Sequence, residues 1–210
     1  GVVYDGAAHG ENGHTDTYLA EGHSVESVII DGSQIDAGVY EDELVPHDAK
    51  IVDANGNDVT KNYEITYVAG DLTITKRGAG DNKVTIKAND NLGVVYDGAA
   101  HGENGHTDTY LAEGHSVKTV TIDGSRTAVG KYPKELVPHD ATIVDAHGND
   151  VTKNYVITYV EGDLEIVSPD TVVVKIKGNS DTVEYDGKLH EVNGYTVVSI
   201  SNDLYTASDF

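Results

Sequence analysis

The chain has 210 residues, with 36 acidic residues against 14 Lys and Arg, and a formal net charge of −22. A surface of that sign repels phosphate, so we expect no nucleic-acid binding and no attachment to an anionic membrane. There is no apolar run long enough to span a bilayer, which argues against direct membrane insertion. Cysteine is absent, which excludes disulfides, thiolate catalysis and Cys-ligated metals.

An internal repeat dominates the sequence. Residues 1–25 return without a change at 93–117, a period of 92, and residues 26–75 align with 118–167 with sixteen differences in fifty positions. A third, much more divergent copy follows. The tripeptide Tyr-Asp-Gly marks all three copies, at residues 4–6, 96–98 and 185–187. An apolar fraction of 38% also suits several small β units better than one large core.

The domain boundaries do not coincide with the repeated letters. Alternating first strands are predicted at 83–87 (KVTIK), before the second Tyr-Asp-Gly, and at 172–177 (VVVKIK), before the third. This pattern suggests a window on a longer repeat chain. The expected organisation is a first repeat at 1–77 without its first strand, a linker at 78–81, a complete repeat at 82–168, a linker at 169–170 and the N-terminal part of a divergent third repeat at 171–210.

The complete repeat consists of short β-branched segments with Gly, Asn, Asp or Pro between most of them. No segment keeps a helical period for three turns, so we predict strands throughout. In chain order the predicted strands are 84–87, 116–122, 141–144, 155–160 and 164–167.

Comparison of the two copies identifies the buried face of these strands. Between NYEITYV and NYVITYV the only difference is Glu64 against Val156, while the alternate positions keep Tyr, Ile and Tyr. Change on one parity alone is typical of a strand with one buried face, and about 85 residues of such strands predict a small β-sandwich. On the first strand, Val84 and Ile86 are predicted to point inward. The core residues predicted on the last two strands are Tyr155, Ile157, Tyr159, Leu164 and Ile166.

Several motifs of the second copy together resemble a known family. They are the Tyr-Asp-Gly tripeptide at 96–98, Gly114-His115 before a strand, and IVDAHGNDVT at 143–152 followed by NY, ITYV and GDL. The set resembles the YDG-type MBG repeats of bacterial surface proteins, over essentially all of 82–168, most of 1–77 and only the opening of 171–210.

The resemblance implies a fold and a setting. The implied fold class is all-β, with tandem small immunoglobulin-like β-sandwich domains in an elongated array. The implied setting is a large secreted or wall-attached protein, commonly an adhesin or stalk, so the expected localisation is extracellular, at the cell surface or cell wall. The family supplies no catalytic residue to transfer.

A turn in each copy has the composition of a calcium loop. In the first copy, oxygen-bearing side chains alternate along it as Ca²⁺ requires. The Gly stands at the fourth place instead of the sixth, and no bidentate Glu closes the loop. His147, a poor Ca²⁺ ligand, replaces one candidate in the second copy. We interpret the segment as a hairpin turn and expect no cofactor, with calcium as the alternative. Its candidate ligands are Asp53, Asn55, Asn57 and Asp58.

The histidines and one Lys–Asn pair offer further chemistry. Histidines in an acidic protein could hold Zn²⁺, but their spacing matches no compact ligand motif, and turn-edge surface positions explain them better. Lys87 on the first strand and Asn154 near a late strand are the residue types of a self-formed amide bond, although Asn154 suits a turn equally well. The repeated histidines are His9, His14 and His23, which return as His101, His106 and His115.

No nucleophile has a recognisable setting, so we expect no enzyme. The leading hypothesis is a structural repeat of a stalk or fibre, whose partners are neighbouring repeats of the same chain. One alternative is a module that binds a host glycan, mucin or protein. It is weakened by the absence of Trp and by the core-like parity of most Tyr. Another alternative is a filament of like chains, in which an incomplete sheet edge accepts a strand from another chain.

Overall fold

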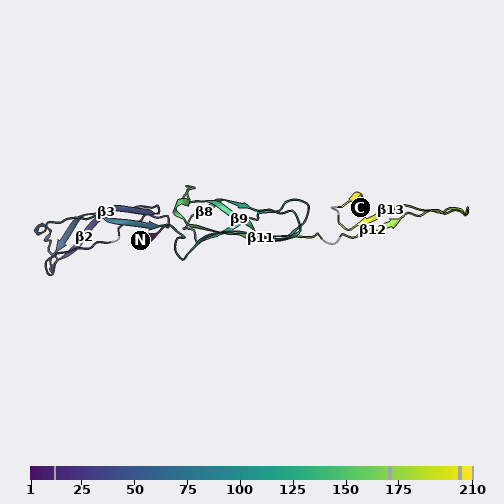
Figure 1. Ribbon diagram of the computed structural model, residues 1–210. Helices are drawn as coiled ribbons and strands as arrows, with labels where there is room; N and C mark the ends of the chain where they lie inside the picture. Colours follow the sequence, from purple (N-terminus) through teal and green to yellow (C-terminus); the bar gives the residue numbers. More distant parts are fainter. Residues whose placement is uncertain (12, 170–171, 203–204, 210) are drawn as a thin grey trace.

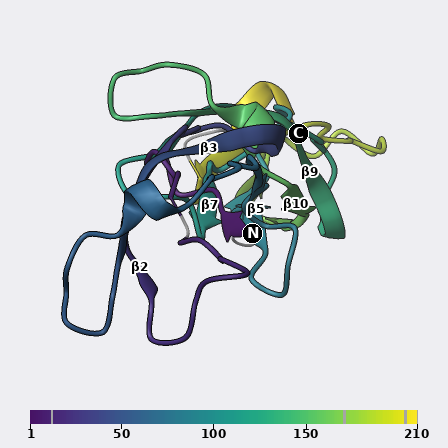
Figure 2. The ribbon, with the colours of Figure 1, turned by 90° about the vertical axis from the view of Figure 1, so that its left-hand side faces the viewer.

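The computed structural model describes residues 1–11, 13–169, 172–202 and 205–209. Over these residues the protein is all-β, with short 3₁₀ turns as its only helical segments. Curled sheets follow one another along an elongated molecule (Figure 1), and viewed end-on the copies overlap around one axis (Figure 2). No described helix is long and apolar enough to cross a membrane. Residues 170 and 171, where the second predicted linker ends and the third repeat starts, lie outside the described residues.

A four-stranded sheet of the same topology occurs in each of the first two copies. In both, the short first strand runs parallel to its neighbour and the other pairs are antiparallel. The strand order is β1 (Val2–Val3), β4 (Gly70–Thr75), β3 (Gly38–Val52), β2 (Ser24–Asp31) in the first copy and β6 (Asn91–Val95), β11 (Gly162–Val167), β9 (Gly130–Val144), β8 (Ser116–Asp123) in the second.

The second copy also has a three-stranded sheet, in the order β10 (Ile157–Val160), β5 (Val84–Ala88), β7 (His106–Thr109). Strand β5 is central: it pairs parallel to β10 and antiparallel to β7. In the first copy the counterparts of β7 and β10, residues 14–17 and 65–68, form no strand. These nearly identical segments therefore form strands only in the second copy, where β5 lies between them.

The remaining elements are short. Two 3₁₀ turns, η1 (Thr60–Asn62) and η2 (Thr152–Asn154), occupy equivalent places in the two copies. The C-terminal segment forms a hairpin of β12 (Val174–Gly178) and β13 (Tyr195–Ile200), followed by η3 (Ala207–Asp209).

The core of the second copy is built on β5. Val84, Ile86 and Ala88 are all 0% exposed, and the residues between them are half-buried, which confirms the predicted inward register. Ala88 clusters with Leu136 on β9 and with Leu164 and Ile166 on β11. A strand whose alternate residues all meet the opposite sheet supplies much of the apolar burial that a small domain can obtain.

The other core predictions are confirmed in part. Tyr155, Leu164 and Ile166 are buried as predicted. Ile157 and Tyr159 are only half-buried. Both lie on β10, at the edge of its sheet, and the Tyr159 hydroxyl accepts the Ala141 N–H at 2.9 Å, which holds the side chain at the rim.

Truncating Ile86 to Ala should lower the free energy of unfolding of the second repeat by about 2–4 kcal/mol, because it opens a cavity in a fully buried layer. Calorimetry of the whole chain should show one transition moving to lower temperature. The matched change Thr85→Ala, on the outward side of the same strand, should leave that transition nearly unmoved. Equal shifts for the two variants would show that β5 does not carry the core.

Candidate functional site

The candidate functional site is the junction between the first and second copies. Tyr4, of the Tyr-Asp-Gly tripeptide, continues the β1–β4 ladder through its N–H and is 1% exposed. Its ring packs edge-on against Tyr155 of the second copy, 5.6 Å between centroids, and lies 5.9 Å from the His115 ring. The Tyr155 hydroxyl meets His115 Nδ1 at 2.7 Å and accepts the Ala112 N–H. An aromatic side chain of one copy is thus part of the packing of the next.

A buried amide completes this contact. Asn154, in η2, is 0% exposed, and both ends of its side chain bond to the loop between β2 and β3 of the first copy. Its Nδ2 donates to Asp36 Oδ1 at 2.8 Å, and its Oδ1 accepts the Ala37 N–H at 2.9 Å. Since a buried amide is costly unless it is bonded, these bonds fix the position of one copy against the other.

An ion pair flanks the amide. Lys153 Nζ donates to Asp36 Oδ2 at 2.7 Å. This bond, together with the one from Asn154, lowers the pKa of Asp36 from its ordinary value. The side chains of Lys153 and Asp36 are 68% and 44% exposed, so solvent screens the pair and its contribution is modest. The neutral, buried Asn154 is therefore the main polar contact.

The connection between the copies is itself held in place. The Arg77 N–H donates to the Asn154 carbonyl, and the Arg77 carbonyl accepts the Val156 N–H. The Arg77 guanidinium lies 4.2 Å from the Tyr110 ring centroid, and its Nε donates to the Tyr110 carbonyl at 2.6 Å. A further guanidinium nitrogen lies 3.4 Å from the Tyr4 carbonyl. The backbone beside the predicted linker at 78–81 is thus bonded to the second copy.

Two glycines permit these close approaches. Gly6 has φ +86°, and a Cβ there would lie 2.8 Å from His115 Nε2. Gly98, its counterpart, has a similar φ but open space around it, so the crowding at Gly6 comes from the junction. Gly78 has φ +89°, and a Cβ there would collide with the Val156 carbonyl. Any side chain at either position would be strained and would also separate the copies.

Burial sets the protonation state of the junction. Desolvation lowers the pKa of His115, which favours its neutral form. Burial also raises the pKa of Tyr4 and Tyr155, so both rings stay un-ionised. The aromatic contact is therefore made between neutral groups at neutral pH.

The candidate calcium turn uses its oxygens internally. Asp53 Oδ1 accepts the N–H groups of Asn55 and Asn57, and Asp53 Oδ2 accepts the Asn57 amide, while Asp58 accepts the Thr60 N–H. Gly56 has φ +79° and lies in a turn whose two sides are joined by the β-bridge between Val52 and Asp58. These contacts favour the hairpin interpretation, and no cluster of three metal-ligating side chains occurs among the described residues.

The histidines fall into separate local pairs. One set bonds to the Asp of the Tyr-Asp-Gly tripeptide, as His9 does with Asp5 at 2.8 Å, and His101 and His190 repeat this contact. His23 instead meets the Tyr63 hydroxyl, as His115 meets Tyr155. Four of the six repeated histidines, His9, His23, His101 and His115, thus serve as hydrogen-bond partners of neighbouring side chains.

The structure gives separate partners to the two residues of the proposed amide bond. Lys87 pairs with Asp90 at 3.4 Å and is 44% exposed, whereas Asn154 bonds to the first copy. No hydrogen bond or ion pair between described residues joins Lys87 to Asn154.

Sequence reasoning did not identify Tyr4, Asp36 or Arg77 as contacts between copies, and it assigned Tyr155 to the interior of its own repeat. The sequence differences between the two copies nevertheless carry a signal of this junction. Asp36 becomes Ala128 and Arg77 becomes Pro169, so the second copy has neither group with which to repeat this junction.

No family model, curated protein or solved structure matches this chain. Function is therefore inferred from the repeats and their junction.

Replacing Asn154 with Ala should lower the stability of the junction by about 1–3 kcal/mol, because Asp36 and the Ala37 N–H lose a buried partner. The chain offers a matched control in Asn62, the same residue of the first copy, whose side chain is exposed. Asn62→Ala should change stability by less than about 0.5 kcal/mol. The measurement is the melting temperature of both variants by calorimetry, and an equal effect would contradict a junction role for Asn154.

Acid should weaken the junction through Asp36. Because its pKa is lower in the folded state, the carboxylate stabilises the fold above its ordinary pKa of 3.8 and loses this effect as the pH falls through the lower, folded value. The melting temperature should therefore fall more steeply with acid in the unchanged chain than in Asp36→Ala, the residue of the second copy. High salt should reduce the difference between the two pH dependences, since the Lys153–Asp36 pair is exposed. If the melting temperatures of the two chains fell in parallel with pH at low salt, the contribution of Asp36 to stability would be refuted.

Proposed function

We propose that the chain is a non-enzymatic structural segment of a bacterial cell-surface adhesin, stalk or extracellular fibre, made of tandem immunoglobulin-like β-sandwich units. The observation that carries the proposal is the junction, in which Tyr4 and Asn154 are almost fully enclosed by contacts between two copies. Flexibly joined binding domains do not need such a contact. A spacer that holds a distal part at a fixed distance and direction does need it.

Charge and repetition support the same role. The net charge of −22 keeps neighbouring rods apart and in solution. The two four-stranded sheets share topology and register, so the two copies are equivalent units of one elongated array. The location that fits this role is outside the cell, at the surface or wall.

The glycan-binding alternative has less support from the exposed aromatics. Tyr18 is 100% exposed, as a sugar-stacking residue would be. Its counterpart Tyr110, however, has the Arg77 guanidinium of the preceding copy over its ring and is 40% exposed. Tyr18 is therefore better explained as part of a surface suited to contact with another repeat.

The rod is tested by measuring the distance between equivalent points of the two copies. Asn55→Cys and His147→Cys place two spin labels on equivalent exposed turns of a chain with no other cysteine. Double electron–electron resonance should give one narrow distance distribution. Adding Asn154→Ala together with Tyr4→Ala should broaden it, because the amide and the aromatic contact are both removed.

The double-cysteine chain with Asn62→Ala serves as the control and should keep the narrow distribution. A broad distribution in the chain without further changes would show that the copies move independently, and the spacer proposal would fail.

A further inference from the structure

His115 lies in the contact between the two copies, where its imidazole ring can take up a proton. The ring centroid is 5.9 Å from that of Tyr4 in the first copy and 6.0 Å from that of Tyr155 in its own copy. Its Nε2 is so close to the first copy that a Cβ on Gly6 would lie 2.8 Å away. A change in the charge of His115 therefore takes place inside the junction.

The hydrogen bonds of Tyr155 require a neutral His115. The Tyr155 hydroxyl accepts the Ala112 N–H at 3.2 Å, so its own hydrogen is free to donate to His115 Nδ1, at 2.7 Å. A protonated imidazole donates from both of its nitrogens. The hydroxyl hydrogen would then have no acceptor among the described residues, and Tyr155 is only 5% exposed. Protonation of His115 thus leaves a buried donor unpaired while the junction is closed, which is costly.

The surroundings of His115 also favour its neutral form. Desolvation by burial is the largest cause of its lowered pKa, whose ordinary value is 6.5. The positive charge of Arg77, in the connection between the copies, lowers this pKa as well, while the Asp145 carboxylate in the turn after β9 acts against both. Tyr4 and Tyr155, which pack on the ring, have raised pKa values and stay un-ionised. The closed junction therefore holds His115 without a charge.

Separation of the copies exposes His115 to water and restores its ordinary pKa. The separated copies then bind a proton more readily than the closed junction does, so acid favours separation. The stabilisation from neutral His115 is complete well above pH 6.5 and is lost as the pH falls through the lower pKa of the closed junction. Asp36 stays ionised down to about pH 5, since its own pKa lies below 3.8. The effects of the two groups therefore occur in different pH ranges.

Each repeat has another histidine, which responds to acid in the opposite direction. His47 joins β2 to β3, with its Nδ1 3.0 Å from Asp48 and its Nε2 3.1 Å from Asp31. His139 repeats both contacts in the second copy. The bond to Asp48, and then that to Asp31, raises the pKa of His47. Its contribution is fully present below the ordinary 6.5 and is lost only as the pH rises through the raised, folded value. Mild acid thus keeps these pairs intact within each repeat.

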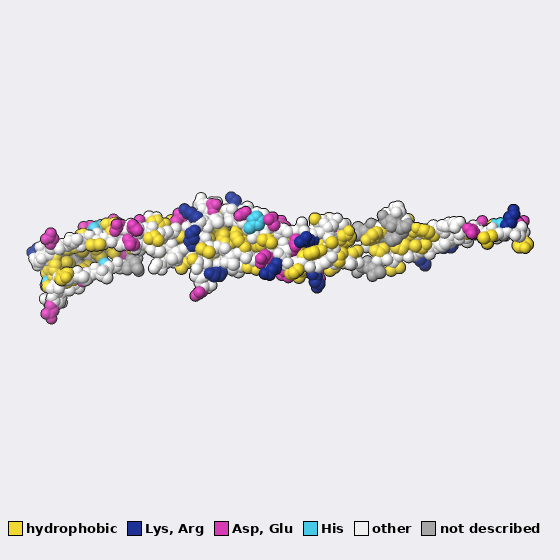
Figure 3. Space-filling view, in the orientation of Figure 1, with side chains coloured by type: hydrophobic (Ala, Val, Ile, Leu, Met, Phe, Trp, Pro, Cys, Tyr) yellow, Lys and Arg dark blue, Asp and Glu magenta, His cyan; other side chains and the backbone are white. Residues whose placement is uncertain are grey.

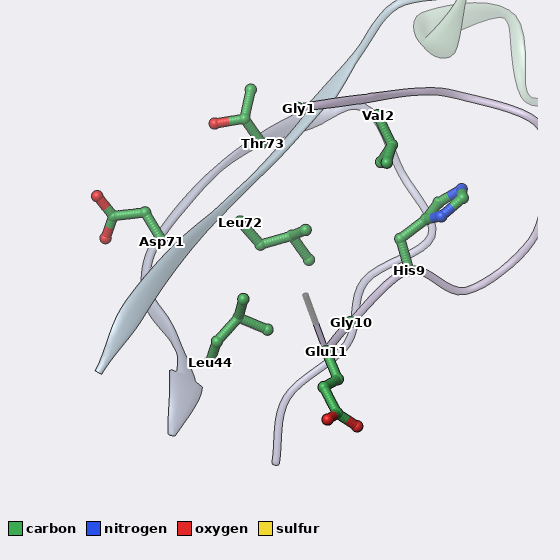
Figure 4. A pocket seen from close by; sticks show the side chains of 9 residues that line it. All are labelled: Gly1, Val2, His9, Gly10, Glu11, Leu44, Asp71, Leu72 and Thr73. Atoms are coloured by element: carbon green, nitrogen blue, oxygen red, sulfur yellow. The ribbon is translucent and has the colours of Figure 1, made fainter. Parts of the chain in front are cut away.

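Two further histidines of the first copy bond within that copy. His9 lies beside a hollow of about 330 Å³ (Figure 4), and its Nε2 bonds to Asp5 at 2.8 Å. His23 Nδ1 meets the Tyr63 hydroxyl at 2.7 Å, the same bond that His115 makes in the second copy. His23 is therefore a matched control for His115 away from the contact between the copies.

Surface charge does not separate the copies in acid. Acidic side chains are visible along the first two copies (Figure 3), and the net charge at pH 7 is −22. As the pH falls, protonation of surface groups reduces this charge, so repulsion between the copies weakens. A separation in mild acid must therefore come from a specific group in the junction.

We propose that the junction is an acid-sensitive joint, in which protonation of His115 separates the two copies while each repeat stays folded. The inference rests on the proposed spacer role, since it concerns the contact that makes the array rigid. The copies stay linked through residues 78–83, where Gly78 and Gly80 allow the backbone to bend. The array is thus rigid at neutral pH and flexibly jointed in mild acid, and the change reverses when the pH is raised.

The joint is tested with the spin labels at Asn55→Cys and His147→Cys. Between about pH 7.5 and about pH 5, the ratio of the broad to the narrow component of the distance distribution should rise by about threefold or more. His115→Gln removes the titrating ring, so the distribution should no longer change with pH, whatever its width. His23→Gln, the matched control, should keep the full response.

Two measurements on the unchanged chain complete the test. Proton NMR of the histidine rings should show His115 titrating below 6.5, and this titration should move toward 6.5 when Tyr4→Ala and Asn154→Ala open the junction. Hydrogen exchange should give the amides of residues 157–160 the same protection factors at both pH values, because the repeat itself stays folded.

Several results would overturn the proposal. A narrow distribution at both pH values in the unchanged chain would show that acid does not separate the copies. A full response in His115→Gln would assign the effect to another group, and titration of His115 at or above 6.5 would remove its cause. Loss of protection at residues 157–160 together with broadening would show unfolding of the repeat. A distribution that is already broad at neutral pH would refute the spacer role, and this inference with it, so the two failures are told apart.

Discussion

The central strand β5 is the constraint on which the folded second repeat depends. Among the strands that the structure describes, β5 alone pairs with both β7 and β10, and its three inward residues are 0% exposed. The first copy shows the effect of the same sequence without such a strand: the four-stranded sheet keeps its order and register, but the opposite sheet does not form. One sheet therefore forms from strands that all lie within the repeated letters, and the other needs a central strand from outside them.

The junction depends on this arrangement and adds a second kind of contact. Because only residues 78–83 separate Arg77 from β5, the strand that fills the core also brings Tyr4 against Tyr155 and Asn154 against Asp36. Aromatic packing stabilises the contact between the two copies, and the hydrogen bonds of the buried amide fix their relative orientation. The loss of Asp36 and Arg77 in the second copy means that the next connection along the chain must be made differently. Junctions in a repeat chain can thus vary while the repeats stay alike.

The sequence alone predicts part of the strands of the second repeat, because one-sided change between copies reports which face is buried. It misses β6, β7 and the part of β9 before residue 141. It nevertheless places Val84 and Ile86 correctly, since alternation along a short strand has only two possible faces. It fails at the junction for a physical reason: Tyr155 looks like a core residue whether the atoms that bury it come from its own repeat or from Tyr4. The burial of Ile157 and Tyr159 is overestimated, because the alternation of residue types does not reveal that β10 is an edge strand.

Hydrogen exchange within one chain tests the dependence on β5 most directly, since the two copies are each other's control. Residues 65–68 and residues 157–160 share the sequence ITYV, and peptides that contain them can be told apart by mass spectrometry through Glu64 and Val156. The amides of β10 should be strongly protected, and those of residues 65–68 in the monomeric chain should exchange rapidly. Equal protection at the two sites would contradict the account, because the second sheet would then form without its central strand.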